Sequence, residues 1–398
     1  MINAEEARAV LLDSVAPSGV ITVSLDRSLG FVLAESIISG ENIPPFDNAA
    51  MDGYAISTTG SGQSPWRLKI VGEIAAGSVP VNALRAGEAI SIMTGAKIPA
   101  GCDAVVQQEW TQPDDQAHIK VLRPVSPGHN VRSAGGDIQL GSTVLRAGQQ
   151  IRPQEIGTLA SIGRRFVSIY RPVSVAILAT GNEIVGIDQK PADGKIRNSN
   201  AHALDALVRE SGCEPVPVGT APDDRKELMT KITQGLACDM LITTGGISVG
   251  KYDLVMEVLK EIGVEIKFWK VNIKPGMPLM FGLYHGKPVF ALPGNPVSTM
   301  VTFLQFVKPA LRKMTGHQDP GSRISLRARL GHEIRKSDGK RHFVRGVLEN
   351  VNGSMTVRSA GSQVSNVLSS LVRANCLIII PEEVEFLRAN EEVEVELL

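Results

Sequence analysis

The chain has 398 residues, of which 41 are basic and 41 acidic, so its formal net charge at pH 7 is zero. This length exceeds what one ordinary hydrophobic core organises, and we expect two to four domains. The balanced charge removes the electrostatic case for nucleic acid as a partner, and no apolar stretch in the sequence approaches the roughly 20 residues that span a bilayer.

The first part of the chain is predicted to be helical and then all-β. Asn3 can cap an amphipathic helix over residues 4–12, and a second helix is expected over residues 28–34. Between residue 43 and about residue 146, short β-type runs are broken by Gly and Pro, at 66–71, 89–93, 104–108 and 118–122. Pro153 then opens a helical pattern over 155–162, which we expect to pack with the opening helices, so that the all-β module is an insertion.

From residue 172 the pattern alternates between strand and helix. The expected strands are 174–179, 214–219, 240–244 and 288–292, and the expected helices are 201–210, 226–236, 254–262 and 296–314, with a hairpin around 270–281. This alternation predicts a doubly wound α/β domain. After Pro320 short strands return, the most apolar at 377–380, and the chain ends in an acidic tail.

Two glycine loops in the α/β part indicate an anion site. One follows the apolar run 240–242 and contains Gly245 and Gly246, and the other follows the run 289–292 and reads Pro293-Gly294-Asn295-Pro296. Loops at the carboxyl ends of strands are where open α/β sheets bind ligands. Asn295 is a suitable N-cap and Pro296 a suitable first helical residue, so we expect free N–H donors there.

The first of these loops also matches the opening of a phosphate-binding P-loop, G-x-x-x-x-G-K, at residues 245–251. The next residue is Tyr252 rather than the Ser or Thr that holds magnesium in that motif, and Asp253 follows. We therefore reject the P-loop interpretation. Taken alone, the loop is equally compatible with a glycine-rich turn that binds nothing.

The four cysteines, Cys102, Cys213, Cys238 and Cys376, are scattered without C-x-x-C spacing. This argues against a disulfide framework or a zinc site and fits a reducing compartment. The first residues lack the basic and apolar regions of a signal peptide. We expect a soluble, cytoplasmic protein without a membrane partner.

Eight motifs, in order along the chain, resemble the signature of the MoeA family, the molybdopterin molybdenumtransferases of molybdenum cofactor biosynthesis. They lie at residues 44–55 (Pro-Pro-Phe-Asp-Asn-Ala-Ala-Met-Asp-Gly-Tyr-Ala), 72–77, 92–96, 132–137, 180–183, 244–250, 273–276 and 292–298. The resemblance covers essentially the whole chain. It implies insertion of molybdate into adenylylated molybdopterin, with magnesium present and AMP released.

The resemblance also implies an α/β plus β multidomain fold and an elongated homodimer. Residues 1–45 and 147–171 would form a helical hinge and dimerisation part, 46–146 the inserted β module, 172–318 the molybdopterin-binding α/β domain, and 319–398 a C-terminal β-barrel-like domain. The cleft would lie between the α/β domain of one subunit and the β module of its partner. The adenylyltransferase that supplies the substrate is a further expected partner.

The expected site residues fall into three sets. Catalytic candidates are Asp52, Thr94 and Asp137 of the β module, acting across the dimer, with Glu183 and Asp253. Magnesium is a hard cation that takes carboxylate oxygens, and its candidate ligands are Glu183, Asp253, Asp223 and Asp224. The substrate and anion set comprises Gly245, Gly246, Ser248, Lys270, Lys274, Pro293, Asn295, Pro296, Ser298, Arg345 and Ser362.

Each of these assignments has a plainer alternative. Asp223 or Asp224 could simply cap the following helix, which is worth about 1 kcal/mol. Lys270 and Lys274 could be solvated charges of a hairpin, and Asp52 could bond its own turn. Met277 stands where many relatives of the family carry a second lysine, which removes a positive charge near the expected anion site.

Two other functions stay open from the sequence. The α/β domain could adenylylate molybdopterin, or the chain could be a non-enzymatic scaffold of the same fold. The sequence does not choose between molybdate and tungstate.

Overall fold

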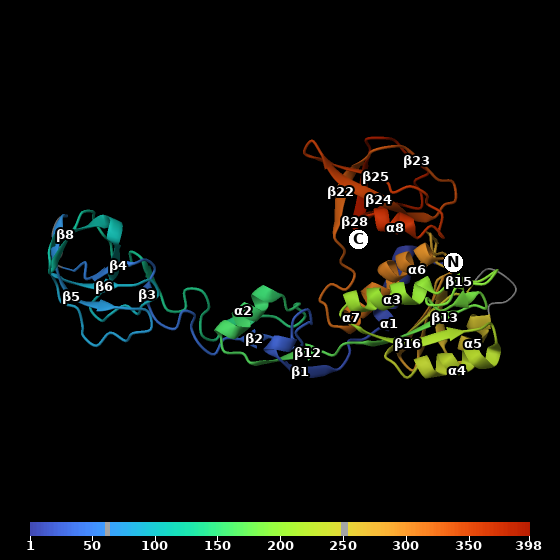
Figure 1. Cartoon of the computed structure of the whole chain (residues 1–398), viewed down its shortest axis with the longest axis horizontal. Coiled ribbons are helices and arrows are strands. Elements are labelled where there is room, and N and C mark those ends of the chain that lie inside the picture. The colour runs from blue at the N-terminus through green and yellow to red at the C-terminus, as the bar shows by residue number, and fades with distance from the viewer. Residues whose placement is uncertain (60–63, 248–253) are drawn as a thin grey trace.

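The computed structural model describes residues 1–59, 64–247 and 254–398. The molecule is elongated, with an all-β body at one end and two packed bodies at the other, joined by a narrow middle part (Figure 1). No helix among the described residues is long and apolar enough to cross a membrane. All four cysteines carry free thiols.

The body at the far end is a six-stranded sheet in the order β7-β4-β6-β5-β9-β8. Side chains alternate between faces along a strand, so Ala55 and Ile56 of β4 enter two different apolar clusters and both faces are covered. The four predicted strands are confirmed. The strands are β4 (Gly53–Ile56), β5 (Trp66–Ile74), β6 (Glu88–Ile92), β7 (Ala104–Gln107), β8 (Thr111–Asp115) and β9 (His118–Val121), with β3 (Asn48–Ala49) paired to β10 (Val131–Arg132) beside them.

The middle part is formed by two segments of the chain, one that precedes the β module and one that follows it. β1 (Val20–Ser24) pairs antiparallel with β12 (Phe166–Tyr170), β2 (Ile37–Ile38) pairs with β11 (Thr143–Leu145), and α2 (Pro153–Ser161) covers them. Their apolar side chains, including Leu33, Ile151 and Leu159, form a separate small core.

The helix predicted over 28–34 is wrong. A 3-10 turn, Leu25–Arg27, comes before it, and Val32 and Leu33 then form isolated bridges with Gln150 and Ile169. Gly30 adopts a φ of +85°, a left-handed conformation that interrupts a right-handed helix.

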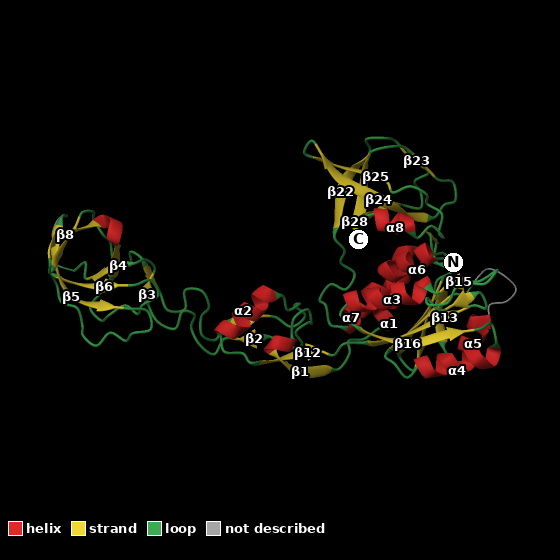
Figure 2. Ribbon diagram, in the orientation of Figure 1, coloured by secondary structure: helices red, strands yellow, loops and turns green. Residues whose placement is uncertain are grey.

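The α/β domain is built on a six-stranded sheet in the order β16-β13-β17-β21-β20-β18. Its first four strands are parallel, and β20 and β18 join antiparallel at one edge. Helices cover both faces (Figure 2): Ile177 packs with Leu204 of α3, while Ala176 packs with Leu228 of α4. The strands are β13 (Ser174–Thr180), β16 (Glu214–Ala221), β17 (Met240–Thr244), β18 (Glu265–Trp269), β20 (Met280–Tyr284) and β21 (Lys287–Leu292), and the helices are α3 (Ser199–Glu210), α4 (Arg225–Gly235), α5 (Leu254–Ile262), α6 (Pro296–Thr302), the π-helical turn η3 (Phe303–Val307) and α7 (Lys308–Met314). A two-stranded ladder of β14 (Ile184–Val185) and β15 (Ile196–Arg197) lies beside them.

The opening helix α1 (Ala4–Ser14) does not pack with α2 as we expected. Its buried residues Ala4, Ala7 and Leu11 belong to the core of the α/β domain, together with Val301 of α6. Asn3 caps it as predicted, accepting a hydrogen bond from the Glu6 N–H at 2.8 Å. A short amphipathic helix can pack on any complementary apolar face, and its sequence does not specify which face that is.

The C-terminal domain is a closed barrel. Its five long strands pair in one continuous order, and the last of them, β26, pairs with the first, β24. A strand from the α/β domain, β19 (Ile273–Lys274), runs parallel to β24. The hairpin predicted around 270–281 is therefore β18 paired with β20, with β19 between them reaching across to the barrel. The barrel elements are β22 (Ser325–Leu330), β24 (Arg341–Val351), β25 (Ser354–Ser359), β26 (Cys376–Ile380) and β28 (Glu392–Leu397), with β23 (Ile334–Arg335), β27 (Phe386–Leu387) and α8 (Ser369–Arg373) at its ends.

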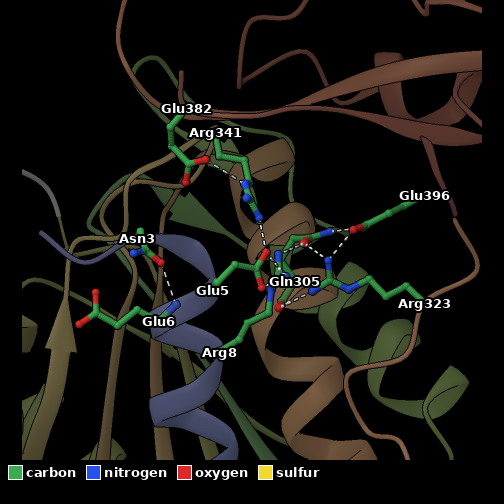
Figure 3. Close-up of polar contacts among 9 residues, drawn as sticks. All are labelled: Asn3, Glu5, Glu6, Arg8, Gln305, Arg323, Arg341, Glu382 and Glu396. Atoms are coloured by element: carbon green, nitrogen blue, oxygen red, sulfur yellow. Dashed lines mark hydrogen bonds and ion pairs between the residues drawn. The ribbon is translucent and has the colours of Figure 1, made fainter. Parts of the chain in front are cut away.

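A polar network fixes the barrel on the α/β domain (Figure 3). Gln305 of the π-helical turn is 1% exposed, and its Oε1 accepts hydrogen bonds from Arg8 Nη2 at 3.0 Å and Arg323 Nη1 at 2.5 Å. Its Nε2 donates to Glu396 Oε2 at 2.7 Å. Arg341 joins the barrel to α1 through an ion pair with Glu5.

Candidate functional site

Three loops meet at one edge of the α/β sheet. The strands β13, β17 and β21 are parallel neighbours, and their registers pair Ala179 with Thr244 and Thr244 with Leu292. The loops that follow these strands therefore lie side by side, as the sequence predicts. The Gly245 N–H donates to the Leu292 carbonyl at 3.1 Å, which joins two of the loops directly.

Glycine is required where these loops touch. Gly245 has a φ of +94°, and a Cβ there would lie 2.4 Å from the Thr180 carbonyl oxygen. At Gly294 an added Cβ would make only an ordinary van der Waals contact, 3.5 Å from the Gly245 Cα, so the requirement falls on Gly245. The backbone of the two predicted glycine loops thus lies close together and open to a ligand.

The three loops line a cleft of about 700 Å³. Of the predicted substrate residues, Gly245, Gly246, Pro293, Asn295 and Pro296 line it, and so does Glu183. Ser248 and Asp253 lie outside the described residues.

The cleft also contains residues that the sequence analysis missed. Asn200 donates to Thr244 Oγ1 at 2.9 Å and to the Gly294 carbonyl at 2.8 Å, so it holds both glycine loops. The available signal was the Asn-Ser-Asn run at residues 198–200, which begins α3 with Asn198 as N-cap. Arg197, Asn198, Ser199, Asn200, Met277 and, from the barrel, Asn366 line the cleft.

Two of the predicted carboxylates line an adjoining hollow of about 430 Å³. Glu183 and Asp223 line it together with Glu257, which pairs with Arg225 at 3.3 Å. The hollow shares Thr180, Glu183 and Gly246 with the cleft. Asp223 exchanges hydrogen bonds with Asn182: the Asn182 N–H donates to Asp223 Oδ2 at 3.3 Å, and the Asp223 N–H donates to Asn182 Oδ1 at 3.1 Å. The two strand-end loops therefore present their carboxylates together.

Asp224 has a different position. Its Oδ1 accepts hydrogen bonds from the N–H groups of Lys226 and Glu227, at 3.0 and 2.9 Å, as the N-cap of α4. Of the two neighbouring aspartates, Asp223 lines the hollow and Asp224 caps the helix.

The carboxylate pair suits magnesium. Mg²⁺ is commonly bound through one or two carboxylates, with water and phosphate oxygens completing its octahedron. Among the described residues no group of three His, Cys, Asp or Glu side chains forms a closed protein cage. Glu183 and Asp223 thus fit an open site that shares its ion with a phosphate.

The two predicted lysines do not line the cleft. Lys274 Nζ lies 3.1 Å from Asp338 Oδ2 of the barrel, and Lys270 Nζ lies 4.2 Å from the centre of the Trp269 ring. Burial opposes ionisation of Asp338, but hydrogen bonds from His342 and Lys274 outweigh it and hold the pKa of that carboxyl well below its usual range. Lys274 is therefore engaged by a carboxylate that stays charged.

Arg345 is buried inside the barrel at 1% exposure, so the expectation that it binds an anion in this cleft is corrected. Its guanidinium donates to Ser370 Oγ at 3.1 Å and to the carbonyls of Ser362 and Val364 at 3.0 and 3.2 Å. Burial lowers its pKa to about 10. Through these carbonyls Arg345 holds the segment that leads to Asn366. The Ser362 side chain is exposed and does not line the cleft.

The expectation of free N–H donors at the start of α6 also needs correction. The Val297 N–H donates to the Ser365 carbonyl at 3.1 Å, and Asn295 Nδ2 donates to Ser365 Oγ at 3.0 Å instead of capping the helix. Ser298 is 4% exposed and does not line the cleft. This helix start anchors the barrel segment, which closes one side of the cleft.

The predicted residues of the β module form a local unit of their own. Asp52 Oδ1 accepts hydrogen bonds from Thr94 N–H at 2.7 Å and Thr94 Oγ1 at 2.8 Å, and these lower the pKa of Asp52. Asp137 is exposed, and its N–H donates to the Ile43 carbonyl. Within one chain the β module lies at the opposite end of the molecule from the cleft (Figure 1).

Comparison with known families matches nearly the whole chain. Residues 2–163 match the MoeA N-terminal region (domain I and II), residues 176–313 the "Probable molybdopterin binding domain", and residues 327–398 the MoeA C-terminal region (domain IV).

Similar proteins agree with these matches over their full length. A molybdopterin molybdenumtransferase of Haemophilus influenzae is 35% identical over 100% of this chain and 98% of its own length. A protein of the same name from Staphylococcus aureus is 34% identical over 99% of this chain and 95% of its own. The crystal structure of a molybdopterin biosynthesis MoeA protein from Pyrococcus horikoshii matches with a TM-score of 0.88 at 34% identity and covers 100% of both chains.

Proposed function

The chain belongs to the MoeA family of molybdopterin molybdenumtransferases, and we propose that it inserts molybdate into adenylylated molybdopterin with release of AMP. It is a transferase of molybdenum cofactor biosynthesis. The observation that supports the specific reaction best is the pair of joined hollows at the sheet edge. One has glycine backbone and amide side chains, the other has the Asp223 carboxylate, and the Glu183 carboxylate lines both.

These two hollows fit two parts of one substrate. A cleft of about 700 Å³ is of ordinary size for a cofactor-sized ligand. Ser199 and the amide oxygen of Asn200 can hydrogen-bond to the polar pterin edges, while the open backbone at Gly245 and Gly246 accommodates an anionic group. Asn366 brings the barrel against the ligand and helps to exclude water.

Glu183 and Asp223 would hold magnesium beside the adenylyl phosphate. When bound there, the ion supplies charge neutralisation at the phosphoryl oxygens and the leaving AMP. The Glu183 carboxylate lies over Gly181, where an added Cβ would be 2.5 Å from Glu183 Oε2, so a side chain at position 181 would displace this proposed ligand. Asn182 orients Asp223 through the two hydrogen bonds between them. In this proposal Asp253 adds a third carboxylate.

The working enzyme is, in this proposal, a homodimer. Asp52, Thr94 and Asp137 lie at the end of the chain that is remote from the cleft, so they can act on the substrate only if a second copy brings its β module there (Figure 1). The Asp52–Thr94 hydrogen bonds keep the Asp52 carboxylate ionised and in a fixed orientation. Such a site is complete only when two subunits meet.

Three further assignments belong to the same proposal. The enzyme works in the cytoplasm, receives its substrate from an adenylyltransferase, and uses molybdate with tungstate as the competing oxyanion. An adenylyltransferase role for this chain is not favoured, because its full-length relatives bear the molybdenumtransferase name. A scaffold role would leave the carboxylate hollow without a purpose.

Release of AMP from adenylylated molybdopterin tests this function. With magnesium and molybdate we expect AMP together with molybdenum bound to the pterin product, and neither when molybdate is omitted. Chelation of magnesium should abolish the release. AMP release without metal on the product would indicate a hydrolase, and no AMP from the folded protein under any of these conditions would contradict the transferase assignment.

A further inference from the structure

The cleft has fewer cations than its proposed ligand requires. Molybdate is a dianion, and the proposed magnesium would offset the charge of the adenylyl phosphate rather than that of the oxyanion, yet Arg197 is the one cation among the described residues that line the cleft. Lys274 is paired with Asp338, Lys270 lies on Trp269, and Arg345 is buried in the barrel. Another positive charge is needed near the ligand.

Lys340 lies where such a charge would be useful. Its ammonium contacts the Met277 sulfur at 3.5 Å, and Met277 lines the cleft. A thioether is a weak acceptor, whereas an ammonium has three donors to satisfy. Within the described part of the chain, Lys340 forms no ion pair with a carboxylate. Its charge is therefore available to an incoming anion.

The position of Lys340 is set by the contact between barrel and α/β domain. Asn272 Nδ2 donates to the Gly339 carbonyl at 2.9 Å, and the Arg341 N–H donates to the Asn272 carbonyl at 3.1 Å. Lys336 Nζ holds the Lys340 carbonyl at 2.8 Å. The backbone on both sides of Lys340 is thus fastened, and its side chain points back to Met277 of the other domain.

We propose that Lys340, supplied by the C-terminal barrel, binds the oxyanion substrate in the cleft. The proposal rests on the proposed function for the identity of the ligand. Met277 gives the cleft wall no charge, and Lys340 of the barrel brings an ammonium directly beside Met277. When the oxyanion enters, the ammonium exchanges the sulfur contact for charge-assisted hydrogen bonds to oxygen, which are stronger.

Substitution of Lys340 provides the test. In Lys340→Gln we expect the KM for molybdate to rise about tenfold and the affinity for molybdate alone, measured by calorimetry, to fall by a similar factor, as for one charge-assisted hydrogen bond. Lys340→Arg keeps the charge and should stay within about threefold of the parent. The double variant Lys340→Gln with Met277→Lys restores a cation at the same contact and should regain most of the lost affinity.

Lys260→Gln is the matched control, since it removes the same charge from an exposed position on α5. It should leave both readouts unchanged. Circular dichroism of every variant identifies loss of fold, and the rescue by Met277→Lys distinguishes a role in binding from a merely structural one.

The two readouts separate this inference from the proposed function. If the parent releases AMP and Lys340→Gln has an unchanged KM and affinity for molybdate, the inference fails while the function stands. If the parent releases no AMP but binds molybdate, and Lys340→Gln binds it more weakly, the function fails while the inference stands. A parent that binds no molybdate overturns the inference.

Discussion

Asp223 and Asp224 are neighbours in sequence with different tasks. Asp223 lines the hollow that it shares with Glu183, and it is held by Asn182. Asp224 accepts two backbone N–H groups at the start of α4. Both are exposed aspartates at adjacent positions. Variants of the two residues can therefore be compared to distinguish an effect on activity from an effect on stability.

Substitution of Asp223 should therefore affect the activity, and substitution of Asp224 should affect the stability. We expect Asp223→Asn to lower the rate of AMP release at least about tenfold, with a higher magnesium requirement, because the proposed magnesium site loses one of its carboxylates. Asp224→Ala should lower the free energy of unfolding by about 1 kcal/mol through loss of the cap and keep its activity. Activity assays and urea unfolding measure the two quantities; the reverse pattern would show that Asp224, not Asp223, faces the metal.

At the level of single residues, the sequence predicts which types of side chain are present near the cleft but not how they are engaged. Lys274 is paired with Asp338, which lies 64 positions further along the chain. Arg345 is satisfied by carbonyls 17 and 19 residues away, inside the barrel. Such partners depend on how distant segments meet, so the lysines and Arg345 could be placed near the site but not in their actual contacts.

The strands of the α/β domain, and the positions at which they end, could be predicted from the sequence. The strands β13, β17 and β21 are short apolar runs, each followed by a glycine or proline loop, and the run 240–244 is buried at every position. The helices over 201–210 and 254–262 follow from their apolar spacing, since Leu204 and Leu207 of the first and Val255 and Leu259 of the second are buried. The expected helix over 28–34 failed because apolar residues in a short strand bridge can imitate helical spacing over one turn.

Asp239 joins the beginnings of two of these strands. Arg171, just after β12, donates to both of its carboxylate oxygens at 2.8 Å, and Ser174 at the start of β13 donates through its N–H and hydroxyl at 2.8 and 2.7 Å. Hydrogen bonding to Arg171 is the main cause that lowers the pKa of Asp239 to about 2. The carboxylate therefore fastens the hinge to the start of β13 and β17.

This arrangement predicts a pH dependence of stability. The folded pKa of Asp239 is about 2 against an ordinary value of 3.8, so its stabilisation is complete above pH 4 and is lost as the pH falls toward 2. Asp239→Asn should be less stable than the parent at pH 7 by about 1–2 kcal/mol, a range that allows for the partial exposure of Arg171. The difference should shrink between pH 4 and pH 2 in urea unfolding.

Asp205→Asn is the control for this measurement, because Asp205 pairs with Arg209 on the surface of α3. An exposed pair one helical turn apart is worth about 0.3–0.5 kcal/mol. A loss in Asp239→Asn no larger than in this control, or one that does not change with pH, would contradict the bridging role.

Within one chain, the cleft and the predicted site residues of the β module lie at opposite ends of the molecule. The barrel is fastened to the α/β domain through Gln305, Arg323 and Glu396 (Figure 3), and it closes the cleft with Asn366. In the part of the chain that the structure describes, the β module connects to this assembly through the narrow hinge and lies far from it (Figure 1). The order of the domains could be predicted from motifs, but the packing of α1 on the α/β core could not, since a short amphipathic helix fits more than one apolar face.

The central claim is that one site combines the cleft of one subunit with the β module of another. Mixed dimers of two inactive parents, Asp52→Asn and Glu183→Gln, test it most directly. If the site is shared, each mixed dimer contains one intact site, and random mixing should restore roughly a quarter of the parental AMP release, since half of the dimers are mixed and half of their sites are intact. If each chain uses its own β module, every site keeps one defect and the mixture stays as inactive as its parents.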